Sequence, residues 1–280
     1  MEFRNSLTIV IFATLRMQLN KPDSALLILA HGSTENADSS APTKLQARSI
    51  RETGIFGAVH CAFWKEEPSF RQVAPMIEQD EIYVVPNFIS EGYFTRQIIP
   101  REMELSERTS ERNSKYLHYC DPVGIHPSMT DLLLARALAL RPDEIPLNDT
   151  ALIIIGHGTP KNKSSTASIK QQVRALQLLD PGFAEITNAY MEEAPFISDW
   201  ESIVTSRHVI ALPFFISDGL HSYEDIPKML GIEKLSSDRK NVYLFGKRTL
   251  QYSNAIGTDP SMARVIIDQV AYFDEHYRND

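Results

Sequence analysis

Short apolar runs alternate along this chain with stretches in which apolar side chains recur at helical spacing. The runs do not alternate strictly between apolar and polar residues, which is typical of parallel strands that are buried on both faces. We expect strands near 25–30, 57–63, 82–89 and 116–120, and again at 151–156, 185–190, 208–216 and 241–246. Helical spacing is clearest for Ile169, Val173, Leu176 and Leu179, and for Met262, Ile266 and Phe273. The alternation predicts an α/β fold with parallel sheets and helices on both faces.

The chain also repeats itself. Residues 25–33 resemble residues 151–159, and three further pairs follow in the same order at nearly constant spacing: 62–68 with 189–195, 83–92 with 210–219, and 124–129 with 257–262. Arg141–Thr150, with two prolines and several turn formers, is expected to link the copies. We therefore predict two homologous doubly wound parallel-sheet domains at 21–147 and 148–280, after an N-terminal extension at 1–20. The charged stretch Glu104–Lys115 is expected to be a solvated connection.

Several reactive side chains follow the predicted strands of the second half. His157 comes directly after the first strand, Glu192 and Glu193 after the second, and His221 shortly after the third. In the usual doubly wound order the first strand lies between the second and third, so these groups should meet at the carboxyl edge of the sheet. Two imidazoles and a carboxylate can bind a divalent transition metal or accept protons.

Each of these residues alone also fits an ordinary structural role. A His-Gly-Ser or His-Gly-Thr sequence can simply form a turn and cap a helix, and Glu192 or His221 alone can be a surface residue. Asp225, close to Pro227, is expected to cap a helix. The remaining histidines lack a comparable setting and are interpreted as structural or surface residues: His60, His118, His126, His208 and His276.

The combination of these motifs resembles the sirohydrochlorin chelatases, the CbiX-like branch of the class II chelatases. That family shows a strand that ends in His-Gly-Ser/Thr, then an aromatic-hydrophobic-Glu segment before a proline. A strand-Pro-Phe-Leu/Ile run follows, leading to Gly-x-His-x-x-x-Asp-Ile-Pro, which is complete here from Gly219 to Pro227. The resemblance covers residues from about 24 to 275 as two copies, and it implies the chelatase-like fold.

The two copies differ at the chemistry-bearing positions. Where the second half has Glu192, His221 and Asp225, the first has Lys65, Phe94 and Ile98, although His31 matches His157. We therefore expect the metal and catalytic site in the second half, with His157, His221 and Glu192 (or Glu193), and a degenerate site in the first. The first half is expected to supply the other wall of a cleft. The expected substrate-binding residues are His31, Ser33, Thr159, Tyr93, Phe94 and Gly219.

The resemblance implies a lyase that inserts Co²⁺ or Fe²⁺, or else Ni²⁺, into sirohydrochlorin without ATP, in cobalamin or siroheme biosynthesis. The histidine pair would bind the metal and the glutamate would handle pyrrole protons. No organic cofactor is expected, and the divalent metal is a co-substrate. The alternative is a non-catalytic carrier of metal or tetrapyrrole on the same fold. The chain is expected to act as a monomer or a homodimer.

The composition of the chain excludes further classes of protein. The formal charge is −8, with 28 Lys+Arg against 36 Asp+Glu, and it is shared evenly between the halves. An excess of acidic residues speaks against nucleic-acid binding. Only two cysteines occur, which excludes a disulfide framework and fits a cytoplasmic protein. No apolar run is long enough to span a membrane. The sequence has no Gly-x-Ser-x-Gly elbow, which argues against an α/β hydrolase. It also has no Gly-x-Gly-x-x-Gly turn, which argues against a dinucleotide-binding dehydrogenase.

Overall fold

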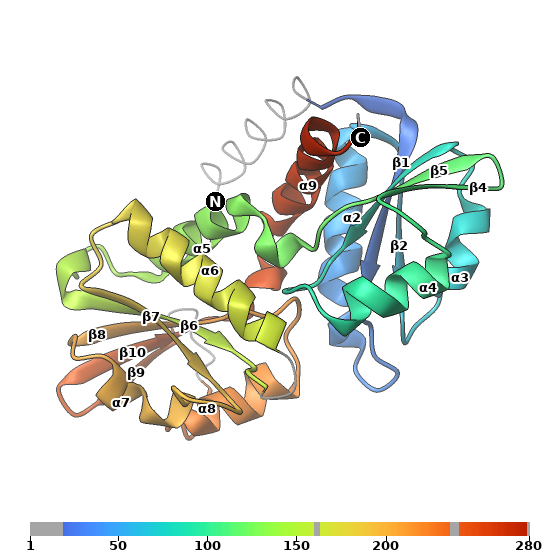
Figure 1. Ribbon diagram of the computed structural model, residues 1–280. Helices are drawn as coiled ribbons and strands as arrows, with labels where there is room; N and C mark the ends of the chain where they lie inside the picture. Colours follow the sequence, from blue (N-terminus) through green and yellow to red (C-terminus); the bar gives the residue numbers. More distant parts are fainter. Residues whose placement is uncertain (1–18, 160–162, 236–240, 279–280) are drawn as a thin grey trace. The chain divides into compact units, whose positions relative to one another are not determined.

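The chain folds as two compact units, each built around a five-stranded sheet (Figure 1). A computed structural model describes residues 19–159, 163–235 and 241–278, so 1–18, most of the expected N-terminal extension, lies outside the described residues. The strand orders are β2-β1-β3-β5-β4 and β7-β6-β8-β10-β9. Four strands of each sheet are parallel, and the first strand of each copy lies between the second and third as predicted. The α/β fold with two homologous doubly wound sheets is confirmed.

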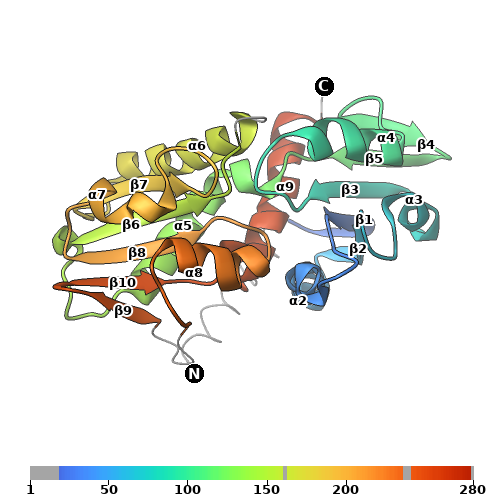
Figure 2. The same cartoon turned by 90° about the horizontal axis from the view of Figure 1, so that it is seen from below.

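The first unit consists of residues up to His126 together with Pro260–Asp280. Its main elements are β1 (Lys21–Ala30), α2 (Ala41–Thr53), β2 (Phe56–Phe63), α3 (Phe70–Val73), β3 (Glu81–Pro86), α4 (Ile99–Met103), β4 (Thr109–Arg112), β5 (Lys115–Tyr119) and α9 (Met262–His276). The central strand β1 is buried from Ser24 to Ala30, because helices cover both of its faces. Helices α2 and α9 lie on one face of the sheet, and α3 and α4 on the other (Figures 1 and 2).

The second unit spans Pro127–Asp259. Its main elements are α5 (Pro127–Leu140), β6 (Thr150–Gly156), α6 (Lys163–Leu179), β7 (Glu185–Tyr190), α7 (Trp200–Ile203), β8 (His208–Pro213), α8 (Ile226–Met229), β9 (Val242–Phe245) and β10 (Arg248–Tyr252). Every residue of β6 is buried. Four apolar residues of α6 were expected to face the core. Ile169, Val173 and Leu176 are buried, whereas Leu179 in the last turn is 54% exposed.

Each sheet ends in an antiparallel hairpin that the apolar pattern did not predict. The run at 241–246 contains β9, which pairs antiparallel with β10, and it is β10 that pairs parallel with β8. In the first unit, β4 forms within the stretch Glu104–Lys115 and pairs antiparallel with β5, so that stretch is not only a connection. Both edge strands are short and partly exposed, but only β4 (Thr-Ser-Glu-Arg) lacks an apolar run, whereas β9 (Val-Tyr-Leu-Phe) has one.

The two copies exchange their last helices. Helix α5 follows the first sheet in sequence but packs against α6 and β8 of the second unit, whereas α9 follows the second sheet and packs against α2 and β3 of the first. The chain therefore passes from one compact unit to the other at His126–Pro127 and at Asp259–Pro260 rather than within the expected linker Arg141–Thr150. The sequence repeat locates the two copies but does not specify which sheet each terminal helix covers.

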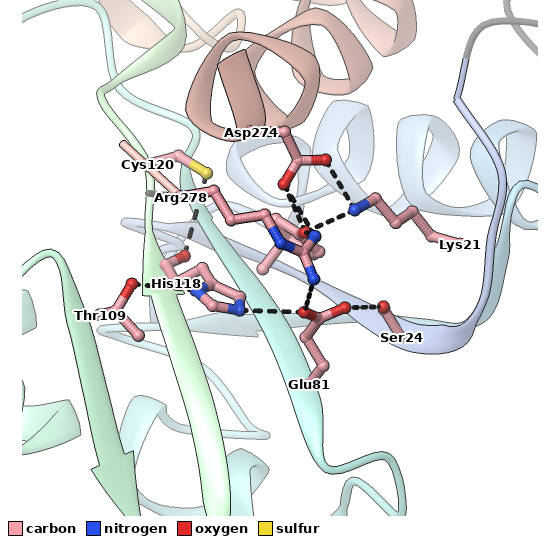
Figure 3. Close-up of polar contacts among 9 residues, drawn as sticks. Lys21, Ser24, Glu81, Thr109, His118, Cys120, Asp274 and Arg278 are labelled. Atoms are coloured by element: carbon pink, nitrogen blue, oxygen red, sulfur yellow. Dashed lines mark hydrogen bonds and ion pairs between the residues drawn. The ribbon is translucent and has the colours of Figure 1, made fainter. Parts of the chain in front are cut away.

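A polar cluster attaches α9 to the first sheet (Figure 3). The hydroxyl of Tyr83 donates to Asp274 Oδ1 (2.6 Å) and accepts from Lys21 (2.7 Å) and from Arg278 (2.6 Å). Beside it, Glu81 accepts hydrogen bonds from Ser24 and from Arg278. His118 is buried between Thr109 Oγ1 (3.0 Å) and Glu81 Oε1 (3.3 Å). The positive and negative groups balance, so the cluster ties the helix to the sheet without leaving an unpaired buried charge.

The cluster predicts that acid destabilises the protein in two stages. Burial lowers the pKa of His118 and outweighs the carboxylate of Glu81, so unfolding takes up a proton below the ordinary pKa of 6.5. Burial acts to raise the pKa of Glu81 and Asp274, but hydrogen bonds from Ser24 and Lys21 and nearby positive charges hold both below their ordinary 4.5 and 3.8. Their contribution is present above those values and is lost as the pH falls through the folded pKa.

Thermal unfolding between pH 7 and 3 will measure both stages. We expect His118→Gln to reduce the first decline, below about pH 6.5, to which His60 also contributes because burial lowers its pKa, and to leave the second. His276→Gln is the matched control, since His276 is exposed at the end of α9 and its one described hydrogen bond is to a carbonyl of its own helix. An unchanged profile in His118→Gln would contradict the assignment.

None of the described helices is long and apolar enough to cross a membrane.

Candidate functional site

His157 lies at the carboxyl end of β6, in a tight turn that only glycine can complete. Gly158 has φ +65°, and a Cβ there would come within 2.7 Å of the Tyr190 side chain and 2.9 Å of Glu193. The carboxylate of Glu193 accepts hydrogen bonds from the Thr159 backbone N–H (3.0 Å) and from the Thr166 hydroxyl (2.8 Å). Glu193 therefore holds the turn in shape.

Glu192 is the glutamate next to the imidazole. Its backbone N–H donates to the carbonyl of His157 (3.0 Å), which fixes the end of β7 beside the end of β6. Its carboxylate oxygen Oε2 lies 3.7 Å from His157 Nδ1, and the side chain is 52% exposed. Of the two glutamates that the sequence left eligible, the structure gives Glu193 a hydrogen-bonding role in the turn and brings Glu192 to His157.

His221 opens a π-helical turn, His221–Asp225, which leads into α8. The backbone N–H of Ile226 donates to the carbonyl of His221, five residues back, as π-helical turns do. Tyr252, on β10, supports the turn by donating from its buried hydroxyl to the Ser222 carbonyl (2.8 Å). Burial raises the pKa of Tyr252, so this hydroxyl keeps its proton.

The structure brings the two histidines of the second unit together. Their ring centroids are 5.2 Å apart and the rings are nearly perpendicular, at 78°. His157 Nδ1 lies 2.8 Å from the Gly158 carbonyl oxygen, and His221 Nδ1 lies 2.7 Å from Asp225 Oδ2. A carbonyl or carboxylate oxygen can only accept, so both Nδ1 atoms carry hydrogen, and in the neutral form of each ring the lone pair lies on Nε2. In that form the pair presents two nitrogen donors.

Asp225 does not cap α8. Its side chain makes no capping hydrogen bond and instead accepts from His221, four residues earlier. The expectation of a capping role was wrong because a π-helical turn runs directly into α8. Asp225 closes that turn and already has helical backbone angles (φ −68°, ψ −51°), whereas a capping residue has extended ones.

The first unit has the same scaffold as this site but not the same set of side chains. Gly32 has φ +67°, the Ser33 N–H donates to Glu66 (2.8 Å), and Phe94 opens the corresponding π-helical turn. The ring of Phe94 stands 4.9 Å from that of His31 at 73°, nearly the geometry of the histidine pair. A phenyl ring thus stands where the second unit has the imidazole of His221.

The expected substrate-binding residues lie in the turns that follow the central strands of the two sheets. Tyr93 is 55% exposed and packs edge-on to the partly buried Phe94, with 5.9 Å between ring centroids. Gly219 accepts from the backbone N–H of Tyr223 (2.9 Å) at the start of the π-helical turn. Ser33 does not open a helix, because α2 begins only at Ala41; its hydroxyl accepts from the N–H groups of Glu35 and Asn36, each at 3.1 Å.

No group of three or more His, Cys, Asp or Glu side chains is gathered closely enough to hold a metal ion in the part of the chain that the structure describes. The histidine pair and the nearby Glu192 are thus an open arrangement rather than a closed cage.

The supporting tyrosines were missed by the sequence interpretation. Tyr119 donates to the Thr95 carbonyl (2.6 Å) in the first unit as Tyr252 does to Ser222 in the second. A signal was present, since Tyr119 and Tyr252 occupy equivalent places before the matched segments 124–129 and 257–262. It was overlooked because β10 was not recognised as a strand.

Comparison with known proteins identifies the family. The CbiX family model matches residues 25–140 and again 151–272, once in each copy. The "Probable sirohydrochlorin cobaltochelatase" of Halobacterium salinarum is 38% identical over 266 residues, which are 88% of this chain and 90% of the relative.

Solved structures show the same fold. DR2241 from Deinococcus radiodurans, described as similar to chelatases with two additional domains, superposes with a TM-score of 0.76 at 24% identity over 89% of this chain and 55% of its own. SirB from Bacillus subtilis with Fe³⁺ superposes with a TM-score of 0.69 at 16% identity, covering 91% of this chain and 98% of its own. The chain therefore belongs to the CbiX family, the sirohydrochlorin chelatase family that its two sets of motifs resemble.

Proposed function

We propose that this protein inserts a divalent metal, Co²⁺ or Fe²⁺, into sirohydrochlorin without ATP, and that the second unit carries the chemistry. The observation that supports this most is the pair His157 and His221, with ring centroids 5.2 Å apart and both Nδ1 atoms hydrogen-bonded. Of the two metals we favour Co²⁺, because the relative from Halobacterium salinarum bears the name of a cobaltochelatase.

The metal is a substrate here, so the site must bind it and then release it. Two imidazole nitrogens suit Co²⁺, Fe²⁺ or Ni²⁺, whereas thiolates would bind these ions more permanently. The carboxylates of Glu192 and Asp225 lie beside the histidines and add negative charge that attracts a cation. An open site with few ligands leaves coordination positions for the pyrrole nitrogens.

Insertion must also remove two protons. The metal ion replaces the two N–H hydrogens of the free macrocycle, so one M²⁺ enters and two H⁺ leave. We propose that Glu192 accepts these protons, because its carboxylate lies 3.7 Å from His157 and is 52% exposed, which allows transfer to water. Glu193 is less suited, since its oxygen already accepts two hydrogen bonds.

We propose that the substrate-binding residues expected from the sequence contact the macrocycle. Gly219 and Thr159 flank the histidines of the second unit, and Ser33, Tyr93, Phe94 and His31 form the corresponding edge of the first. The exposed or partly exposed rings of Tyr93, Phe94 and His31 suit the flat conjugated ring of the macrocycle.

The test is a spectral assay under anaerobic conditions. Purified protein is mixed with sirohydrochlorin and with Co²⁺, Fe²⁺ or Ni²⁺ in turn, with no ATP present. The tetrapyrrole absorption spectrum should shift to that of the metal complex, and each protein molecule should convert more than one tetrapyrrole. We expect multiple turnovers with at least one of the first two metals. Binding of one equivalent of product with no turnover would refute the enzyme and favour a carrier.

A further inference from the structure

His221 and Asp225 form a pair within one turn of the backbone. The Nδ1 to Oδ2 distance is 2.7 Å, short for an N–H to carboxylate hydrogen bond. The two side chains are about equally exposed, at 49% and 48%, so they meet at the surface of the site rather than in the core. Buried structural pairing does not explain the contact.

The first unit provides an internal control for the role of Asp225. There the corresponding residues are Phe94 and Ile98, so the imidazole and the carboxylate are missing together. The π-helical turn Phe94–Ile98 still forms, the Ile99 N–H still donates to the Phe94 carbonyl, and α4 still follows. The carboxylate is therefore not needed to build the turn or to start the helix.

Other parts of the site behave differently in the same comparison. Glu193 and its counterpart Glu66 both hold the His-Gly turn, and Tyr252 and Tyr119 both support the π-helical turn. Structural residues are thus kept in both units, whereas Asp225 is present only in the unit that keeps the second histidine.

We propose that Asp225 is a positioning residue for metal binding: it fixes the tautomer and ring orientation of His221 so that Nε2 faces the incoming ion. The inference rests on the proposed function of the histidine pair and adds a residue to it. A carboxylate that accepts from Nδ1–H also makes Nε2 a better donor, as outer partners of metal-binding histidines commonly do. Without this partner, His221 would populate the other tautomer and other rotamers.

Two variants separate orientation from simple charge. Asp225→Asn keeps an oxygen that can accept from Nδ1–H, and Asp225→Ala removes the acceptor. Glu224→Gln is the matched control, since Glu224 is an exposed carboxylate on the same turn with no described bond to His221. Thermal unfolding of all three will confirm that the fold is intact.

The first measurement needs no metal. In the ¹⁵N–¹H spectrum of the histidine side chains, we expect wild type, Asp225→Asn and Glu224→Gln to show His221 with its hydrogen on Nδ1, and Asp225→Ala to show a mixture of tautomers. An unchanged tautomer in Asp225→Ala would overturn the positioning role, whatever the activity of the protein.

The second measurement is the Kd for Co²⁺ in the absence of tetrapyrrole. Asp225→Ala should weaken binding about 10- to 100-fold, with Asp225→Asn in between and Glu224→Gln within about twofold of wild type. An equal affinity in Asp225→Ala and wild type would also overturn the proposal. Failure of the wild type itself to bind Co²⁺ or to turn over would instead refute the proposed function, so the two failures are distinguishable.

Discussion

Replacing His221 with alanine is expected to reduce the rate of Co²⁺ insertion by more than about 100-fold, because the variant loses one of the two proposed nitrogen donors. His157→Ala should have an effect of similar size. A 100-fold loss corresponds to about 2.7 kcal/mol of transition-state stabilisation, which is reasonable for a ligand bond that the remaining groups cannot replace. The measurement is kcat and KM from the spectral assay, with the Kd for Co²⁺ determined separately.

His31→Ala is the matched control for this prediction. His31 occupies the same turn in the first unit and hydrogen-bonds its own loop in the same way, at 2.8 Å to the Gly32 carbonyl, but it faces Phe94 instead of a second imidazole. We expect a smaller loss, seen in KM for the tetrapyrrole and not in the Kd for Co²⁺. Full activity of His221→Ala, or equal losses in metal affinity for His31→Ala and His157→Ala, would refute the assignment of the chemistry to the second unit.

Apolar runs and repeats were sufficient to predict the central strands of each sheet. Strands β1 and β6 are buried along most or all of their length, so their sequences are continuous apolar runs with little ambiguity. The edge strand β4 was missed for the converse reason, because it pairs on one side only and tolerates polar and charged residues. In the second sheet the apolar run at 241–246 predicted the edge strand β9, whereas β10, which lies between β8 and β9, was missed.

The candidate site was predictable where the side chain follows a strand directly and less so where the backbone is irregular. His157 and Glu192 were expected to meet because parallel strands end at one edge, and their backbones are hydrogen-bonded there. The role of Asp225 was misassigned because a π-helical turn has no sequence signature that distinguishes it from a helix start. Its carboxylate was interpreted by its position before Pro227, whereas its actual partner lies four residues back.

The helix exchange leads to the second large effect: a fragment cut at the repeat boundary, residues 19–147, is not expected to fold. It would lack α9, whose residues Val270 and Phe273 are buried, and it would retain α5, whose buried face covers the other unit. Loss of Phe273 removes an aromatic partner that Tyr83 and His118 share, and loss of Asp274 leaves the Tyr83 hydroxyl without its acceptor.

The energetic loss is large against the stability of a domain. Burying one large apolar side chain contributes about 1.5–3 kcal/mol, and α9 buries several, including Ile266, Val270 and Phe273. Domains are typically stable by only about 5–15 kcal/mol. Removing the helix should therefore abolish cooperative unfolding of the fragment, which circular dichroism during heating will show.

A rearranged fragment provides the matched comparison. Residues 19–126 joined to 260–280 through a flexible glycine–serine linker contain every described element of the first unit and omit α5. His126 packs against Tyr272, about ten residues into α9, so the linker has to span roughly 15 Å, and about ten residues suffice. We expect this fragment to unfold cooperatively with a native-like far-ultraviolet spectrum. If the 19–147 fragment folds equally well as a monomer, then α5 can replace α9 on the first sheet, and the exchange is not required for either unit to fold.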